Sequence, residues 1–107
     1  MSSPSEKIKV AVVEDGQEQR EALRFLISAS PGYACVAACA SAEEALEKIP
    51  PAEPDVVLMD IQLPGMTGID CLQRLKVFLP GVRVMMLTVF EDHDRIFQSL
   101  AAGAMGY

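Results

Sequence analysis

The fold is decided by residues 56–68, which read VVLMDIQLPGMTG. The apolar run at 56–59 predicts a β-strand over 55–59, and this strand leads directly into Asp60. A loop follows at 63–68, because its proline and glycines break both helices and strands. Apolar residues then recur at helical spacing at Ile69, Leu72, Leu75 and Leu79, and Pro80 and Gly81 end this helix. The stretch therefore predicts a strand–loop–helix unit with an acid at the carboxyl end of the strand.

The same alternation extends in both directions from this unit. Toward the N-terminus we expect a strand at Ile8–Val13, then a helix, and then a strand at 33–40. The helix is indicated by apolar residues at helical spacing, namely Ala22, Leu23, Leu26 and Ile27. A second helix follows, which begins with a capping box formed by Ser41 and Glu44 and which we expect to end at Pro50 and Pro51. Toward the C-terminus we expect a strand at 82–87, a helix at 91–102 and a turn at 103–107 that enters a fifth strand. Such alternation predicts an α/β fold with a doubly wound parallel sheet, because parallel strands need crossover connections.

Length and composition favour one globular domain. With 107 residues, of which 50% are apolar, the chain can form one core but hardly two. No apolar run approaches the roughly 20 residues that cross a bilayer, so we expect no membrane contact. Residues 1–6 are small and polar, and we expect a disordered tail there rather than an export signal, with the domain at 7–107 in the cytoplasm. The net charge of −6 repels nucleic-acid phosphates, so any DNA contact would need another domain.

The cysteines fit a reducing compartment. The chain has three, Cys35, Cys39 and Cys71, an odd number with no export signal. On a strand, the Cα atoms of Cys35 and Cys39 would lie about 13 Å apart, which is beyond disulfide reach. We expect both to be buried apolar residues.

Residues that can carry chemistry stand at the carboxyl ends of three predicted strands. Glu14 and Asp15 follow the first strand. Asp60 follows the third, and Thr88 follows the fourth. The carboxyl ends of parallel strands meet at one edge of the sheet, where such folds place their sites. At about 5 Å and an effective dielectric constant near 20, each pair of like charges costs on the order of 3 kcal/mol, so a cation is the natural compensation.

This set of oxygen donors suits Mg²⁺, which prefers oxygen ligands and retains several waters. We expect Asp15 and Asp60 to bind the ion directly, Glu14 to act through a water, and the backbone carbonyl of Gln62 to fill a further position. Asp60 can then act as a carboxylate nucleophile that forms an aspartyl phosphate. The hydroxyl group of Thr88 can donate a hydrogen bond to a phosphoryl oxygen.

Taken singly, these residues have plainer interpretations. Asp15, with Glu18 three residues later, can be only the N-cap of a helix. Asp60 can be only a turn residue before a Pro-Gly loop. A threonine at a strand end, such as Thr88, usually has no special role. Their combination at neighbouring strand ends favours a functional site.

Four motifs together resemble the receiver domains of two-component response regulators. They are VVED at 12–15, LMDIQLPGMTG at 58–68, MLT at 86–88 and AGAMGY at 102–107. The resemblance covers nearly the whole chain from Ile8 onward. The last two motifs are most similar to the NarL/LuxR family, whose receivers precede a helix-turn-helix DNA-binding domain.

The resemblance implies a fold and a set of roles. The fold is flavodoxin-like, with strand order 2-1-3-4-5. Asp60 accepts a phosphoryl group from a histidine kinase, Glu14 and Asp15 hold Mg²⁺, and Thr88 and Tyr107 form a switch pair that alters an output surface. The domain is then a signalling phosphoacceptor rather than an enzyme in the ordinary sense, although it assists its own phosphorylation and dephosphorylation. Its output is transcription control, through a DNA-binding domain outside this chain.

Family members place a lysine three residues beyond the position of Tyr107, where this chain has ended. We therefore expect a receiver domain that is incomplete at its C-terminal end, with a partial fifth strand and no fifth helix. An exposed sheet edge would then permit a homodimer.

Three other functions remain to be compared with this one. A haloacid-dehalogenase-type phosphatase also uses an aspartate nucleophile and Mg²⁺, but it needs an acid where this chain has Gln62. A flavodoxin-like cofactor binder needs a Ser/Thr/Gly-rich loop after the first strand, where this chain is acidic. A receiver-like module that signals by protein contact alone needs no phosphorylation.

Overall fold

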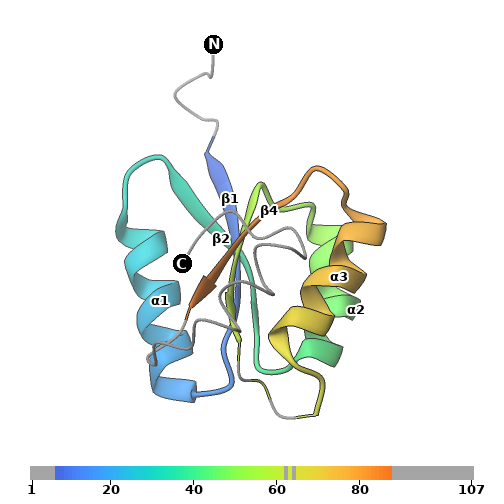
Figure 1. Ribbon diagram of the computed structural model, residues 1–107. Helices are drawn as coiled ribbons and strands as arrows, with labels where there is room; N and C mark the ends of the chain where they lie inside the picture. Colours follow the sequence, from blue (N-terminus) through green and yellow to red (C-terminus); the bar gives the residue numbers. More distant parts are fainter. Residues whose placement is uncertain (1–6, 62, 64, 88–107) are drawn as a thin grey trace.

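The computed structural model describes residues 7–61, 63 and 65–87. The elements in chain order are β1 (Ile8–Val13), α1 (Gln17–Ala29), β2 (Tyr33–Cys39), α2 (Ala42–Ala52), β3 (Val56–Asp60), α3 (Gly68–Phe78) and β4 (Arg83–Leu87). The strands form one parallel sheet in the order β2-β1-β3-β4. Helix α1 covers one face of the sheet, and α2 and α3 cover the other (Figure 1). The predicted doubly wound α/β sheet is therefore confirmed, while the tail at 1–6, the helix at 91–102 and the fifth strand lie outside the described residues.

Helix α2 corrects one sequence-based expectation. Its start is as predicted, because the Oγ atom of Ser41 accepts a hydrogen bond from the backbone N–H of Glu44 at 3.1 Å. Pro50 and Pro51, however, do not close the helix but form part of its last turn. Proline fixes φ near the helical value, so the chain stays helical here, although neither proline has an N–H to donate to the carbonyl four residues before it. The helix ends instead at Glu53, whose φ of 48° is left-handed and whose N–H donates to the carbonyl of Ile49 at 3.1 Å.

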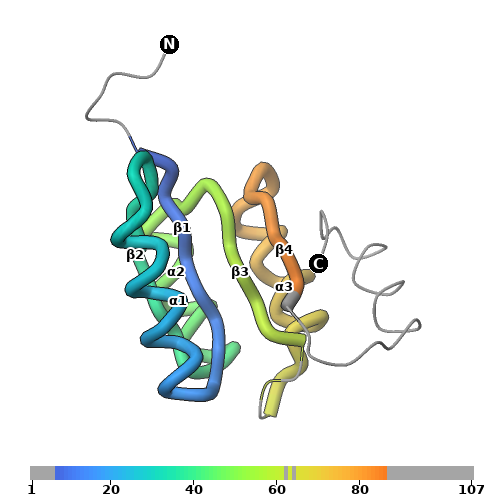
Figure 2. Tube along the Cα trace, turned by 90° about the vertical axis from the view of Figure 1, so that its left-hand side faces the viewer, coloured from blue at the N-terminus to red at the C-terminus, as the bar shows by residue number. Residues whose placement is uncertain are grey.

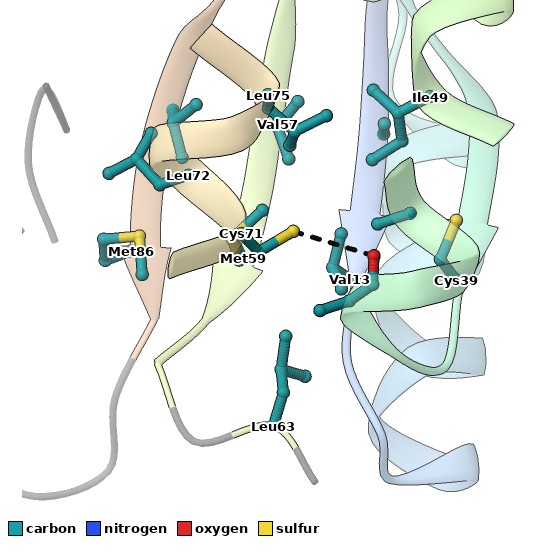
Figure 3. Close-up of a cluster of buried hydrophobic side chains, with 14 of the residues drawn as sticks. Val13, Cys39, Ile49, Val57, Met59, Leu63, Cys71, Leu72, Leu75 and Met86 are labelled. Atoms are coloured by element: carbon teal, nitrogen blue, oxygen red, sulfur yellow. Dashed lines mark hydrogen bonds between the residues drawn. The ribbon is translucent and has the colours of Figure 1, made fainter. Parts of the chain in front are cut away.

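The hydrophobic core lies between the sheet and the α2/α3 layer (Figure 3). Side chains alternate along each strand, so Val57 and Met59 of β3 enter this core while Leu58 faces the α1 side. The largest fully buried side chains include Ile49, Met59, Leu72, Leu75 and Met86. Burying a side chain of this size contributes about 2–3 kcal/mol, and this packing holds β3 between β1 and β4. The core thus fixes the strand that ends in Asp60.

The cysteines divide into two groups. Cys39 and Cys71 are fully buried, and the Sγ atom of Cys71 donates a hydrogen bond to the carbonyl of Ala42 at 3.8 Å (Figure 3). Cys35, which we expected to be buried, is only half-buried. It lies on β2, a strand with a single neighbour in the described sheet, so that side of the strand is less covered. All three thiols are free.

Helix α1 packs differently from α2 and α3. None of its side chains is fully buried, and Phe25 and Leu26 are 70% and 60% exposed. Under it, Val10 and Val12 of β1 are buried in the sheet. None of the helices in the described ranges combines the length and apolarity that a membrane span requires.

Candidate functional site

The register of the sheet brings the acidic residues together. Val13 of β1 lies opposite Met59 of β3, so the residues that follow them, Glu14 and Asp60, lie at the same level at the carboxyl ends of the two strands. This is the carboxyl edge of the sheet, at the bottom of the view in Figure 2. One carboxylate oxygen from each of Glu14, Asp15 and Asp60 lies within 4.8 Å of the other two. The sequence-based expectation that these three side chains converge is therefore met by the geometry.

The acidic cluster is partly buried. Glu14 and Asp60 are half-buried, and Asp15 is exposed. Burial raises the pKa of the Glu14 carboxyl group above its usual value, and the charge of Asp60, a side-chain hydrogen bond with Asp60 and the charge of Asp15 raise this pKa further. The backbone N–H of Gly16, which donates to Glu14 Oε1 at 3.2 Å, acts in the opposite direction. The net effect is that the pKa of Glu14 lies above that of an isolated glutamate.

This donor set fits a hard divalent cation. It consists of carboxylate oxygens alone, and hard cations such as Mg²⁺ prefer oxygen ligands. The exposed side chain of Asp15 leaves one side of the cluster open to water, which suits an ion that keeps part of its hydration shell. Of the other predicted site residues, Gln62, Thr88 and Tyr107 lie outside the described residues.

The N-cap interpretation of Asp15 does not fit the structure. The N-cap of α1 is Gly16 rather than Asp15, and it makes no side-chain capping hydrogen bond. Asp60 is the last residue of β3, and its backbone stays in the ladder opposite Leu87 of β4. The side chain that caps α3 is Thr67, whose Oγ1 accepts from the N–H of Asp70 at 3.1 Å. Asp15 is therefore not explained by helix capping, and Asp60 stands at the end of a paired strand.

Two residues near the site were not singled out in the sequence. The guanidinium group of Arg20 donates to the carbonyl oxygen of Glu14 at 3.0 Å and to that of Asp15 at 3.4 Å. Gly68 lies so close to the end of β3 that a Cβ atom there would be 2.9 Å from Ile61 Cα and nearer still to the carbonyl oxygen of Asp60. The available signals were a basic residue one turn into the helix after the acids, and a glycine at the start of the helix after Asp60.

Comparison with curated proteins identifies relatives over most of the chain. Residues 10–107 match the model of the response regulator receiver domain family. The chain is 37% identical over 100 residues to the transcriptional regulatory protein LnrK of Bacillus subtilis (strain 168), and the match covers 94% of this chain and 46% of LnrK. The chain thus spans about half the length of the curated relatives that it matches.

Solved structures share the fold. A LuxR-family two-component response regulator from Aurantimonas sp. SI85-9A1 superposes with a TM-score of 0.88 at 34% identity, covering 94% of this chain and 72% of that one. CheY of Borrelia burgdorferi, solved in a CheX–CheY–BeF3–Mg²⁺ complex, gives a TM-score of 0.81 at 29% identity, covering 92% and 74%. The family match, the sheet order and the acidic cluster at the carboxyl edge agree, and the chain belongs to the response regulator receiver domains of two-component signalling.

Proposed function

We propose that Asp60 is the phosphoacceptor of this receiver domain and that it takes a phosphoryl group from a histidine kinase in a Mg²⁺-dependent reaction. The observation that carries the proposal is the meeting of Glu14, Asp15 and Asp60 within 4.8 Å at the carboxyl edge of the sheet. Membership of the receiver family supports it and disfavours the phosphatase and cofactor-binding alternatives. Receiver domains are signalling domains, and transcriptional regulators are prominent among the relatives of this chain.

The chemistry follows from the charges. A phosphoryl group carries negative charge, and it must approach a cluster of three carboxylates. Bound Mg²⁺ would neutralise the phosphoryl oxygens and part of the carboxylate charge. Asp15 and Asp60 are the proposed direct ligands, with Glu14 acting through a water. The Mg²⁺ in the solved CheX–CheY complex is consistent with such a site in the family.

In the proposed step, a carboxylate oxygen of Asp60 attacks the phosphorus atom of a phosphohistidine on the kinase. An O–P bond forms, the N–P bond breaks, and the histidine nitrogen keeps the electron pair and takes up a proton. The buried β3 strand holds the Asp60 backbone in place, so the nucleophile is positioned before the donor arrives. Hydrolysis of the same O–P bond by water returns the free carboxylate.

Three further parts of the proposal rest on the family resemblance. They are a backbone-carbonyl ligand from Gln62, a hydrogen bond from Thr88 to the phosphoryl group, and a switch in which Tyr107 turns with Thr88. The proposed consequence is an altered output surface that controls transcription through a DNA-binding domain, in the cytoplasm, with homodimerisation as one mode of output. Relatives that are transcriptional regulators about twice as long as this chain support such an output domain.

The experiment uses acetyl phosphate as the donor, with and without Mg²⁺, and intact mass as the readout. We expect the mass of one phosphoryl group to be added only with Mg²⁺, and to be lost in Asp60→Asn. Asp70→Asn is the matched control, because Asp70 is an exposed aspartate outside the cluster. Labelling that persists in Asp60→Asn would remove Asp60 from the role of acceptor. An unlabelled wild-type protein would favour the alternative of a module that signals by contact alone.

A further inference from the structure

We propose that Arg20 is a positioning residue for this site, which fixes the backbone of Glu14 and Asp15 so that their carboxylates face a bound Mg²⁺. The proposal rests on the function proposed above and adds a residue to it. The guanidinium Nη1 atom donates to both backbone carbonyls of the acidic pair, at 3.0 Å and 3.4 Å. Arg20 is half-buried, and its hydrogen bond to the carbonyl of Glu14 is partly shielded from water, whereas the one to the carbonyl of Asp15 is exposed.

The connection between β1 and α1 needs such a contact. It is only three residues long, Glu14 to Gly16, and the N-cap Gly16 makes no side-chain capping hydrogen bond. The backbone N–H of Arg20 donates to the carbonyl of Gly16 at 2.8 Å, which places Arg20 on the first turn of α1. From that position its side chain reaches back over the connection. One residue thereby joins the helix start to both acidic residues.

The atoms that Arg20 contacts are as important as its charge. Both hydrogen bonds end on backbone carbonyl oxygens, so they occupy none of the carboxylate oxygens that a cation would use. The guanidinium group also places a positive charge beside a cluster of three acids. For Mg²⁺ binding the two effects have opposite signs, because holding the ligands strengthens binding whereas a nearby cation repels the metal.

This opposition makes the proposal testable with one substitution. Arg20→Met removes the hydrogen bonds and the charge while keeping an unbranched apolar stem. If Arg20 acted only through its charge, the variant would bind Mg²⁺ more tightly than the wild-type protein does. If Arg20 positions the ligands, Mg²⁺ binding should weaken by about tenfold, the usual effect of removing a group that orients metal ligands.

Isothermal titration calorimetry of the metal-free protein with MgCl₂ gives the dissociation constant directly. Arg24→Met is the matched control, because Arg24 lies one turn further along α1, is exposed, and pairs with Glu21 at 3.9 Å. We expect an unchanged dissociation constant in Arg24→Met. In Arg20→Lys we expect a loss of affinity of about threefold, since lysine keeps the charge but carries it on a flexible stem without the planar guanidinium group.

The outcomes separate this inference from the proposed function. A dissociation constant in Arg20→Met and Arg20→Lys equal to that of the wild-type protein, or lower, would overturn the role of Arg20 while leaving the metal site standing. A wild-type protein that binds no Mg²⁺ would overturn both. Far-ultraviolet circular dichroism of each variant without metal shows whether the fold is kept. Weaker binding in a folded Arg20→Met variant, with Arg24→Met unaffected, supports the proposal.

Discussion

Replacing Asp60 with asparagine should make the metal-free protein more stable. The three carboxylates lie within 4.8 Å of one another, and each repulsive pair at that separation costs from about 0.9 kcal/mol in water to about 3.5 kcal/mol at an effective dielectric constant of 20. The variant loses two such pairs. Because Asp15 is exposed and Glu14 is only half-buried, solvent screens much of this energy. We therefore expect the free energy of unfolding of Asp60→Asn to rise by about 1–2 kcal/mol, well below the value that a dielectric constant of 20 gives for two pairs.

Thermal unfolding followed by circular dichroism, with EDTA and then with Mg²⁺, checks this expectation. A gain of 1 kcal/mol corresponds to a rise of roughly 4–8 °C in Tm for a domain of about this size. Mg²⁺ should stabilise the wild-type protein but have little effect on Asp60→Asn, because the variant lacks a proposed ligand. Asp70→Asn serves as the control: Asp70 lies in the first turn of α3, where a negative charge favours the helix, so its loss should lower stability by about 0.3–1 kcal/mol.

Two results would refute this reasoning. The first is an Asp60→Asn variant that is less stable than the wild-type protein in EDTA, since relief of repulsion in the cluster could then not be the largest effect of the substitution. The second is an equal stabilisation of both proteins by Mg²⁺, since the ion would then bind without Asp60.

Further predictions concern protonation, thiols and packing. The folded state raises the pKa of Glu14, so its contribution to metal-free stability is complete below the unfolded value of 4.5 and is lost as the pH rises through the higher folded pKa. Urea unfolding at a series of pH values should therefore show that the free energy of unfolding depends less on pH in Glu14→Gln than in the wild-type protein. Burial raises the pKa of Cys39 to about 11 and that of Cys71 to about 12, so iodoacetamide at neutral pH should modify Cys35 first and the other two only after unfolding, as peptide mass mapping would show. Gly68→Ala places a methyl group against the backbone of Asp60, so urea unfolding should show a loss of about 1–3 kcal/mol and acetyl phosphate should label the variant more slowly. Equal stability and labelling in Gly68→Ala and wild type would contradict this close packing of α3 against the end of β3.

Much of the fold was predictable because its signals are local. The apolar runs of β1 and β3 and the helical spacing of Leu72 and Leu75 follow directly from which faces are buried. The convergence of Glu14 and Asp60 was also predictable, since it needs only parallel neighbouring strands that end at the same level. The end of α2 was not, because proline lacks an N–H donor but holds φ near the helical value, and the chain stays helical through Pro50 and Pro51.

The supporting contacts of the site lay beyond sequence reasoning. The Arg20 side chain reaches the carbonyls of Glu14 and Asp15 because of the path that the chain takes after β1. A helical wheel drawn from the sequence shows only that position 20 is polar. The closeness of Gly68 to Asp60 likewise depends on how α3 starts against the end of β3. The half-burial of Cys35 depends on the outer position of β2 in the described sheet.

The uneven packing of the helices affects how the domain opens. Helix α3 carries the buried side chains of Cys71, Leu72 and Leu75, whereas α1 carries none. Amide hydrogens of α1 should therefore exchange with solvent deuterium through small local openings, well before those of α3. Each opening of the first turn of α1 would also release the backbone that Arg20 holds. Mg²⁺ binding at the carboxyl edge of the sheet should then slow this exchange in α1, a helix that supplies no metal ligand itself.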